Sequence, residues 1–222
     1  MEKKKIVKNV LKVVLIIIAI LLVILAICTA RNYIIVKDLQ DKVSQYQSST
    51  NYHIKSVSIG DNGAITKMEY YRKDNKQAVF MERNLNGEIS KVSLYDNGER
   101  TDFFTENKDS KIAQLNSGTI LSFNVYNHLE TENNWQTLLS CIGARIKSAD
   151  YNGKECYIIK DFMSLTSLSF EGAEIYVNKE TGLLEKVTEL GTVSEREYEF
   201  DKVEDSIFAE PDISQYTLKE KE

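Results

Sequence analysis

The sequence predicts a mainly antiparallel β domain with a few helices, of the α+β class, preceded by one N-terminal transmembrane helix. Three observations support this prediction. They are an uncharged apolar run near the N-terminus, a series of strand-like segments separated by turn sequences, and a mid-chain region with helical spacing. Without the apolar run the chain is polar and long enough for one hydrophobic core.

The apolar run extends from Val13 to Ala30 and contains no charged residue. It is about 18 residues long, enough for a helix to cross the hydrocarbon core of a bilayer. The lysines of the basic segment 1–12 all precede it, so the positive-inside bias predicts a cytoplasmic N-terminus. We therefore expect a single-pass cell-membrane protein with a signal-anchor, whose domain from residue 31 onward lies outside the cytoplasm.

Two alternatives for this segment stay open. A cleaved signal peptide has a shorter apolar core, about 7–15 residues, and Cys28-Thr29-Ala30 is a poor cleavage site. A lipoprotein signal would be lipidated at Cys28, but Ile27 stands where such signals carry a small residue.

The charge balance limits the partners that this chain can have. The chain has 28 Lys+Arg and 33 Asp+Glu, and its early lysines belong to the anchor segment. The remaining domain is therefore strongly acidic, which argues against nucleic acid and against broad adhesion to anionic headgroups. The partners we expect are the membrane, a lipid or lipoprotein ligand, and an envelope protein.

Two cysteines, Cys141 and Cys156, lie in the outer domain, where a disulfide is chemically allowed. Buried reduced thiols explain them equally simply. Nothing in their spacing fixes a bridge, so both alternatives stay open. The sequence has no CxxC pair and no Cys/His cluster of the kind that holds a metal ion.

A short juxtamembrane helix is expected within residues 31–50. Ile35, Leu39, Val43 and Tyr46 recur at helical spacing and give one apolar face. The polar run that begins at Ser48 ends it.

Strand-like segments then alternate with turn sequences rich in Asn and Gly, a pattern typical of an antiparallel meander. The expected strands are 52–59, 65–71, 77–82, 89–95, 100–104, 145–151, 154–160, 173–178, 183–190 and 193–202. The expected turns lie near Gly63, Asn75, Gly87, Gly98, Gly153 and Gly182. In the last strand Arg196, Tyr198 and Phe200 alternate with glutamates, which predicts one covered face and one solvated face.

Two short helices are expected between residues 117 and 142. The first is indicated by the spacing of Leu121, Val125 and Leu129, and the second by Trp135, Leu138 and Leu139. The run from Thr131 to Asn134 can cap the second helix.

The C-terminal half contains two segments with a distinctive pattern. The segment 174–187 has a Tyr-containing strand that turns at Thr181-Gly182-Leu183 and returns through Lys186. The segment 198–208 is followed by Ala209-Glu210-Pro211-Asp212. These segments resemble the hairpin and the closing strand of the LolA-like lipoprotein-carrier superfamily, of which this chain would be a membrane-anchored bacterial member. The similarity covers roughly residues 145–215 by motif, and the earlier strands by topology only.

The resemblance implies a bent, unclosed β-barrel whose concave side is covered by helices and holds an acyl chain. The expected domain spans residues 51–216, with a polar tail at 217–222. Because a tethered protein cannot ferry cargo across a periplasm, the membrane-anchored form implies ligand binding near the membrane. The alternative is an envelope sensor or protein-interaction module without a small-molecule ligand.

Aromatic and apolar residues are the candidates for lining such a pocket, although an ordinary helix–sheet core would use the same residues. The candidates are Phe123, Tyr126, Trp135, Leu138, Leu139, Tyr157, Tyr176 and Tyr198. The sequence carries no GxSxG, HExxH or P-loop motif, and its two histidines lie far apart. We therefore expect no enzyme activity, no catalytic residues, no metal and no cofactor.

Overall fold

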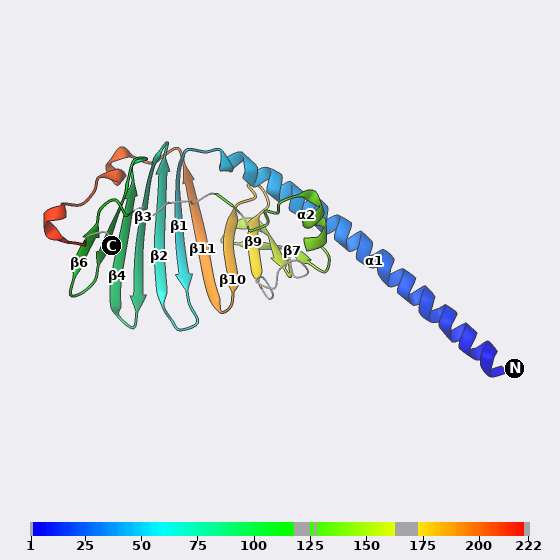
Figure 1. The fold of residues 1–222 in the computed structure, drawn as a ribbon. Helices are drawn as coiled ribbons and strands as arrows, with labels where there is room; N and C mark the ends of the chain where they lie inside the picture. Colours follow the sequence, from blue (N-terminus) through cyan, green and yellow to red (C-terminus); the bar gives the residue numbers. More distant parts are fainter. Residues whose placement is uncertain (1, 118–124, 127, 163–172, 220–222) are drawn as a thin grey trace.

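The computed structural model describes residues 2–117, 125–126, 128–162 and 173–219 (Figure 1). The chain begins with one continuous helix, α1 (Glu2–Gln47). Its first part projects away from the rest of the molecule, and its last part lies against one end of a large sheet (Figure 1). The expected membrane-spanning and juxtamembrane helices are thus one uninterrupted element.

The two parts of α1 differ sharply in exposure. The apolar side chains between residues 10 and 27 are exposed, whereas Val36 and Leu39 are 0% exposed and Val43 is 1% exposed. Burial begins at Thr29 and Asn32, at the C-terminal end of the apolar run. By length and composition α1 is able to span a membrane, a test that an N-terminal signal sequence also passes.

The strands form one unclosed mixed sheet of twelve strands in the order β12-β6-β5-β4-β3-β2-β1-β11-β10-β9-β8-β7. The first six are β1 (Asn51–Ile59), β2 (Ile65–Lys73), β3 (Lys76–Leu85), β4 (Glu88–Asp96), β5 (Thr101–Glu106) and β6 (Lys111–Gln114). The others are β7 (Arg145–Tyr151), β8 (Lys154–Lys160), β9 (Glu174–Asn178), β10 (Leu184–Glu189), β11 (Thr192–Phe200) and β12 (Thr217–Leu218). The outermost strands β12 and β7 do not pair with each other, so the α+β, unclosed-barrel prediction is confirmed.

The pairings between consecutive strands are antiparallel, and each expected strand and hairpin turn is present. Strand β1 pairs with β11 and thereby joins the N-terminal meander to the C-terminal one. The turn at Gly182 packs closely against α1. A Cβ atom on Gly182 would stand 2.5 Å from the Leu39 carbonyl oxygen, so the close approach requires glycine.

The C-terminal segment contains structure that the sequence did not indicate. Two short 3-10 helices, η2 (Asp205–Phe208) and η3 (Ile213–Gln215), precede β12. Strand β12 pairs in parallel with β6, through Thr217 opposite Ile112. The expected polar tail therefore starts with a short strand, because the backbone of β6 offers an unpaired edge that satisfies its hydrogen bonds.

The second expected mid-chain helix is present as α2 (Asn134–Ser140). It begins where predicted, since the side chain of Asn133 accepts a hydrogen bond from the Gln136 backbone amide at 3.0 Å. The first expected helix falls mostly on residues 118–124 and 127, which lie outside the described residues. The described residues from 125 to 133 are not helical, so the helical spacing of Val125 and Leu129 does not continue there as a helix.

The hydrophobic core consists of two clusters on the face of the sheet that packs against α1, which we call the helix face. One cluster joins Val36 and Leu39 to side chains of β7 to β10, and the other joins Val43 to side chains of β1 to β4. The alternation of a strand fixes this face, as on β8, where Ile159 is 0% exposed while its neighbour Ile158 is only partly buried.

Cys141 and Cys156 are both buried free thiols. Cys141 belongs to the core cluster under α1, whereas the alternation of β8 places Cys156 on the other side of the sheet from Ile159. Burial raises the pKa of Cys141 to about 11, so the thiol is the stable form.

Candidate functional site

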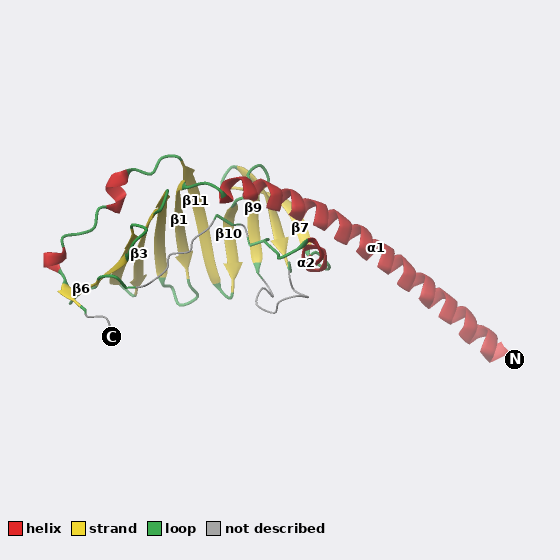
Figure 2. Cartoon of the chain, turned by 45° about the horizontal axis from the view of Figure 1, so that its top comes forward, coloured by secondary structure: helices red, strands yellow, loops and turns green. Residues whose placement is uncertain are grey.

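A polar patch lies on the helix face between the two apolar clusters. It is centred on Arg196 of β11, which is paired with Ser56 of β1. Figure 2 shows α1 and α2 at the β7–β10 end of the sheet, while the C-terminal segment lies at the other end. The described residues between 125 and 133, which we call the segment 125–133, lead across the patch from one cluster to the other, with Val125 in one cluster and Leu129 in the other.

The guanidinium of Arg196 packs against the ring of Tyr126. Its carbon atom lies 4.8 Å from the ring centroid, and Nη2 donates a hydrogen bond to the Tyr126 hydroxyl at 3.0 Å. No ion pair within the described residues involves Arg196. A guanidinium in this position is attracted to the aromatic ring, but no negative charge among the described residues offsets its own charge.

Two further groups face this arginine. The ring of His128 meets that of Tyr126 edge-on, with 4.8 Å between centroids. Burial, together with the positive charge of Arg196, lowers the pKa of His128 to about 4. Burial raises the pKa of Tyr198 to about 12, although the arginine acts in the opposite direction. At neutral pH the patch therefore holds the Arg196 cation, the neutral imidazole of His128 and the neutral phenol of Tyr198.

Hydroxyl groups extend the patch along β1 and β11. The hydroxyls of Ser56 and Ser194 lie 3.1 Å apart, and Ser58 donates to Ser194 at 2.9 Å. The buried hydroxyl of Tyr198 makes no well-formed hydrogen bond to the described residues. The patch therefore offers several hydrogen-bond donors around a single positive charge.

The structure places the sequence-predicted site residues in three different environments. Tyr126 and Tyr198 come together at Arg196, and Tyr157 packs against the apolar cluster beside them. Leu138 and Leu139 are partly buried on α2, while Trp135 on the same helix is 66% exposed. Phe123 lies outside the described residues.

Tyr176 lies on the opposite face of the sheet, away from Tyr198. The amino group of Lys186 lies 5.4 Å from its ring centroid, and its hydroxyl donates to Glu174 at 3.2 Å. The sequence carried the signal for this placement, because Glu174, Tyr176 and Asn178 alternate with the apolar Ile175 and Val177.

Arg196 was not among the candidate residues, although a signal for it existed. In β11 the covered positions are Arg196, Tyr198 and Phe200, so a single charged residue stands in a row that is otherwise aromatic. A charge on the covered side of a strand is unusual enough to mark a site.

The face opposite to α1, which we call the outer face, carries a row of aromatic rings. Neighbouring ring centroids lie 4.1 to 5.7 Å apart along the whole row. Its members are His53, Tyr71, Phe80, Tyr95, Phe104 and Tyr216. Because Tyr216 belongs to the C-terminal segment, that segment is attached to the sheet through the row.

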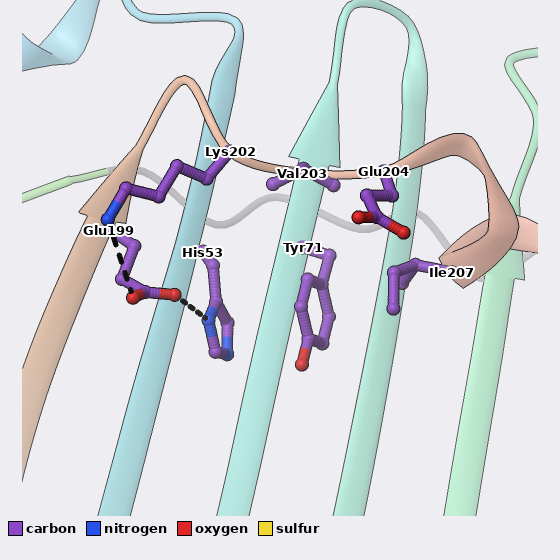
Figure 3. A pocket seen from close by; sticks show the side chains of 7 residues that line it. All are labelled: His53, Tyr71, Glu199, Lys202, Val203, Glu204 and Ile207. Carbon is purple, nitrogen blue, oxygen red and sulfur yellow. Dashed lines mark hydrogen bonds and ion pairs between the residues drawn. The ribbon is translucent and has the colours of Figure 1, made fainter.

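A small cavity lies where the C-terminal segment passes over β1 and β2 (Figure 3). His53 stacks on Tyr71, and its Nδ1 lies 3.3 Å from a carboxylate oxygen of Glu199. The cavity has a volume of about 180 Å³, below the roughly 300 Å³ at which ligand pockets begin. It suits a small polar group rather than an acyl chain.

A larger hollow of about 900 Å³ lies between the β3–β4 turn and the β5–β6 connection. Charged residues of the strand ends and turns, such as Arg83, Glu88 and Asp109, line part of it. Leu85 and Ile89 are the apolar side chains that the lining contains, and polar and charged residues outnumber them, so the walls are not the predominantly apolar ones of a lipid pocket.

Comparisons with known proteins return structural neighbours only. No protein-family model matches the chain, and no curated protein matches it. An uncharacterized conserved protein from Thermus thermophilus is 11% identical with a TM-score of 0.43, covering 82% of this chain and 98% of its own.

Two further neighbours carry more specific descriptions. A domain described as an outer membrane lipoprotein-sorting protein domain, from Vibrio parahaemolyticus, is 11% identical with a TM-score of 0.28, covering 78% of this chain and 95% of its own. A LolA superfamily protein from Nitrosomonas europaea is 9% identical with a TM-score of 0.25, covering 78% and 97%. Because these TM-scores are all below 0.5, the description of the fold relies on the strand order and register of this chain alone.

Proposed function

We propose that this chain is a membrane-anchored extracytoplasmic protein of the cell envelope that binds a hydrophobic ligand, a lipid or the acyl chain of a lipoprotein, on its helix face. The proposal is of a binding protein rather than an enzyme. Its N-terminus lies in the cytoplasm and its β domain lies at the outer surface of the membrane.

The continuity of α1 is the observation that carries this proposal. The same helix supplies an exposed apolar run at residues 10–27 and the buried Leu39 and Val43 of the two core clusters. The domain contacts α1 from Thr29 onward, so the apolar interior of the domain begins next to the membrane surface. An acyl chain leaving the bilayer would have only a short path to it.

Asn32 fixes this arrangement at the membrane end. Its amide donates to the carbonyl oxygens of Ala144 at 2.7 Å and Cys141 at 3.4 Å, just after α2. The end of α2 is thereby held at the level where the apolar run of α1 stops. Hydrogen bonds of this kind keep the orientation of the domain relative to the span fixed.

The alternative function, an envelope sensor or protein-interaction module, is favoured by a different observation. The buried side chains of both core clusters are no more than 8% exposed, so α1 and the segment 125–133 already cover them. Ligand binding on the helix face therefore requires that segment to move aside, whereas an interaction module requires no such movement.

Photolabelling separates the two functions. The full chain is placed in lipid nanodiscs with palmitic acid that carries a photoactivatable group at its methyl end, and labelled peptides are mapped by mass spectrometry. We expect label in the span and also in β1 and β11. Competition by unlabelled octanoic, lauric and palmitic acids should strengthen with length, because each buried methylene contributes about 0.8 kcal/mol. Label confined to the span would support the interaction module instead.

A further inference from the structure

The patch around Arg196 places a charge between two core clusters whose own members are uncharged. The helix face is otherwise built from aliphatic and aromatic side chains, and the neighbouring hydroxyls are neutral. Placing a guanidinium between apolar clusters costs free energy unless a partner is supplied. The described residues supply the hydroxyl and ring of Tyr126 and the neighbouring phenol of Tyr198, but no carboxylate.

Two other arginines of the sheet show how a carboxylate offsets a guanidinium in this protein. Arg100 forms an ion pair with Asp102 at 2.7 Å and donates to Glu210 at 3.3 Å, and Arg145 lies 2.6 Å from Asp161. Both Arg100 and Arg145 have a carboxylate partner although they are exposed to water, whereas Arg196 is partly buried. Arg196, which needs a negative partner most, has none among the described residues.

We infer that the patch around Arg196 binds the oxyanion head, a carboxylate or a phosphate, of an acyl ligand taken from the membrane. This inference rests on the proposed function and specifies the ligand class as an anionic amphiphile. The planar fork of a guanidinium matches the two oxygens of a carboxylate or phosphate. The hydroxyl of Tyr198 and the serine hydroxyls lie where they can add hydrogen bonds to the same head.

The surroundings of the patch fit the rest of such a ligand. Val125 and Leu129 mark apolar clusters on its two sides, so a chain attached to the head finds apolar surface in either direction. The acidic exterior of the domain would repel a free anion. Transfer along the membrane and under the covering segment would avoid that exterior.

Competition photolabelling tests the inference in the intact protein. The photoactivatable palmitic acid is competed by palmitic acid or by hexadecanol, which has the same chain with a neutral head. The experiment is run in nanodiscs at mildly alkaline pH, so that the acid is ionised. In the wild type, palmitic acid should displace label from β1 and β11 at least about tenfold more effectively than the alcohol, the size expected for a charge-assisted hydrogen bond.

Variants assign that preference to the arginine. Arg196→Met should remove the acid-over-alcohol preference, Arg196→Lys should keep part of it, and Tyr198→Phe should reduce it. Lys186→Met is the matched control, because it removes a cation that stacks on Tyr151 and Tyr176 on the outer face, and it should leave the preference unchanged. Thermal unfolding of each variant checks that the fold is retained.

The ways in which this inference can fail are distinguishable. Equal displacement by acid and alcohol in the wild type overturns the anionic-head inference but leaves the proposed function intact. If Arg196→Met weakens displacement by the acid and by the alcohol equally, the role of the arginine is structural, and this result also overturns the inference. Displacement by acetate or inorganic phosphate as strong as by palmitic acid assigns a free oxyanion instead of a lipid. Absence of label in β1 and β11 overturns both proposals.

Discussion

The two faces of this sheet are built from the same strands but differ in their side chains and in what covers them. On the helix face, α1 and the segment 125–133 cover aliphatic side chains and one arginine. On the outer face, aromatic rings form a continuous row and acidic side chains stand among lysines. The helix face is therefore sealed by separate segments, whereas most of the outer face is stabilised by contacts between its own strands.

The difference in cover between the two faces determines where the proposed ligand would enter. A covering segment can move away without breaking the pairing of the strands beneath it. The aromatic row on the outer face offers no such cover, except where the C-terminal segment is fixed through Tyr216 and Phe104, whose ring centroids lie 5.1 Å apart. We therefore expect stability to be concentrated on the helix face and binding to occur there too.

The largest expected effect compares adjacent isoleucines of β8 that face opposite sides. Ile159→Ala removes a side chain that is 0% exposed and should lower the free energy of unfolding by about 2–5 kcal/mol, because it leaves a cavity. Ile158→Ala should cost about 1 kcal/mol or less, since the side chain is only partly buried. Denaturant unfolding measures both, and equal losses would contradict the contrast between the faces.

The contact between α1 and the β9–β10 turn gives the second effect. Gly182→Ala places a Cβ atom 2.5 Å from the Leu39 carbonyl oxygen at a φ of +71°, so α1 has to shift. We expect a loss of roughly 2–4 kcal/mol from strain and overpacking together. Gly63→Ala is the matched control, since it has a similar φ of +75° and open space around the Cβ position. It should cost only about 1 kcal/mol.

The third effect is the pH dependence that His128 contributes. Its pKa is lowered from 6.5 to about 4 in the folded protein, so between these values the unfolded chain binds the proton more readily. The contribution to stability is fully present above pH 6.5 and is lost as the pH falls toward about 4, by up to about 3 kcal/mol.

The His128→Gln variant isolates this contribution, because His53 is retained in both proteins. Denaturant unfolding at a series of pH values should give a shallower slope for the variant than for the wild type below pH 6.5. Identical slopes would mean that His128 is not the group responsible. Above that pH the free energies of unfolding of the two proteins should change with pH in parallel.

The smallest effect on stability is expected at Trp135, which is 66% exposed. Trp135→Ala should change the free energy of unfolding by less than about 0.5 kcal/mol. As the only tryptophan in the chain, it also reports the position of α2. Because tryptophan favours the membrane interface, brominated lipids should quench its fluorescence in nanodiscs. Unquenched fluorescence would mean that α2 stands away from the membrane.

Local patterns in the sequence predicted most of the fold. Asn-Gly turns and period-two strands fix their own geometry, so the hairpins at Gly87 and Gly153 and the alternation of β11 could be read directly. Strand β12 could not be predicted, because two residues pair in parallel with β6 only where tertiary structure brings them there. The pairing of β1 with β11 is likewise non-local.

The candidate site was predicted in part for the same physical reason. Tyr198 and Tyr126 were chosen as aromatic residues, but the centre of the patch is a charge, which a search for apolar pocket walls does not select. Tyr176 was chosen for its ring, although the alternation of β9 directs it to the outer face. The meeting of Tyr126 with Arg196 joins residues far apart in the sequence, so only the folded chain reveals it.

The claim that ligand binds on the helix face and not on the outer face is tested most directly by blocking each face in turn. Ser58→Phe fills the patch on the helix face, and Lys55→Phe adds the same ring on the exposed side of the same strand. The measurement is the yield of photoactivatable palmitic acid label in β1 and β11, with label in the span as the internal standard. We predict that Ser58→Phe abolishes this label and that Lys55→Phe retains it. Equal yields in the two folded variants would contradict the account.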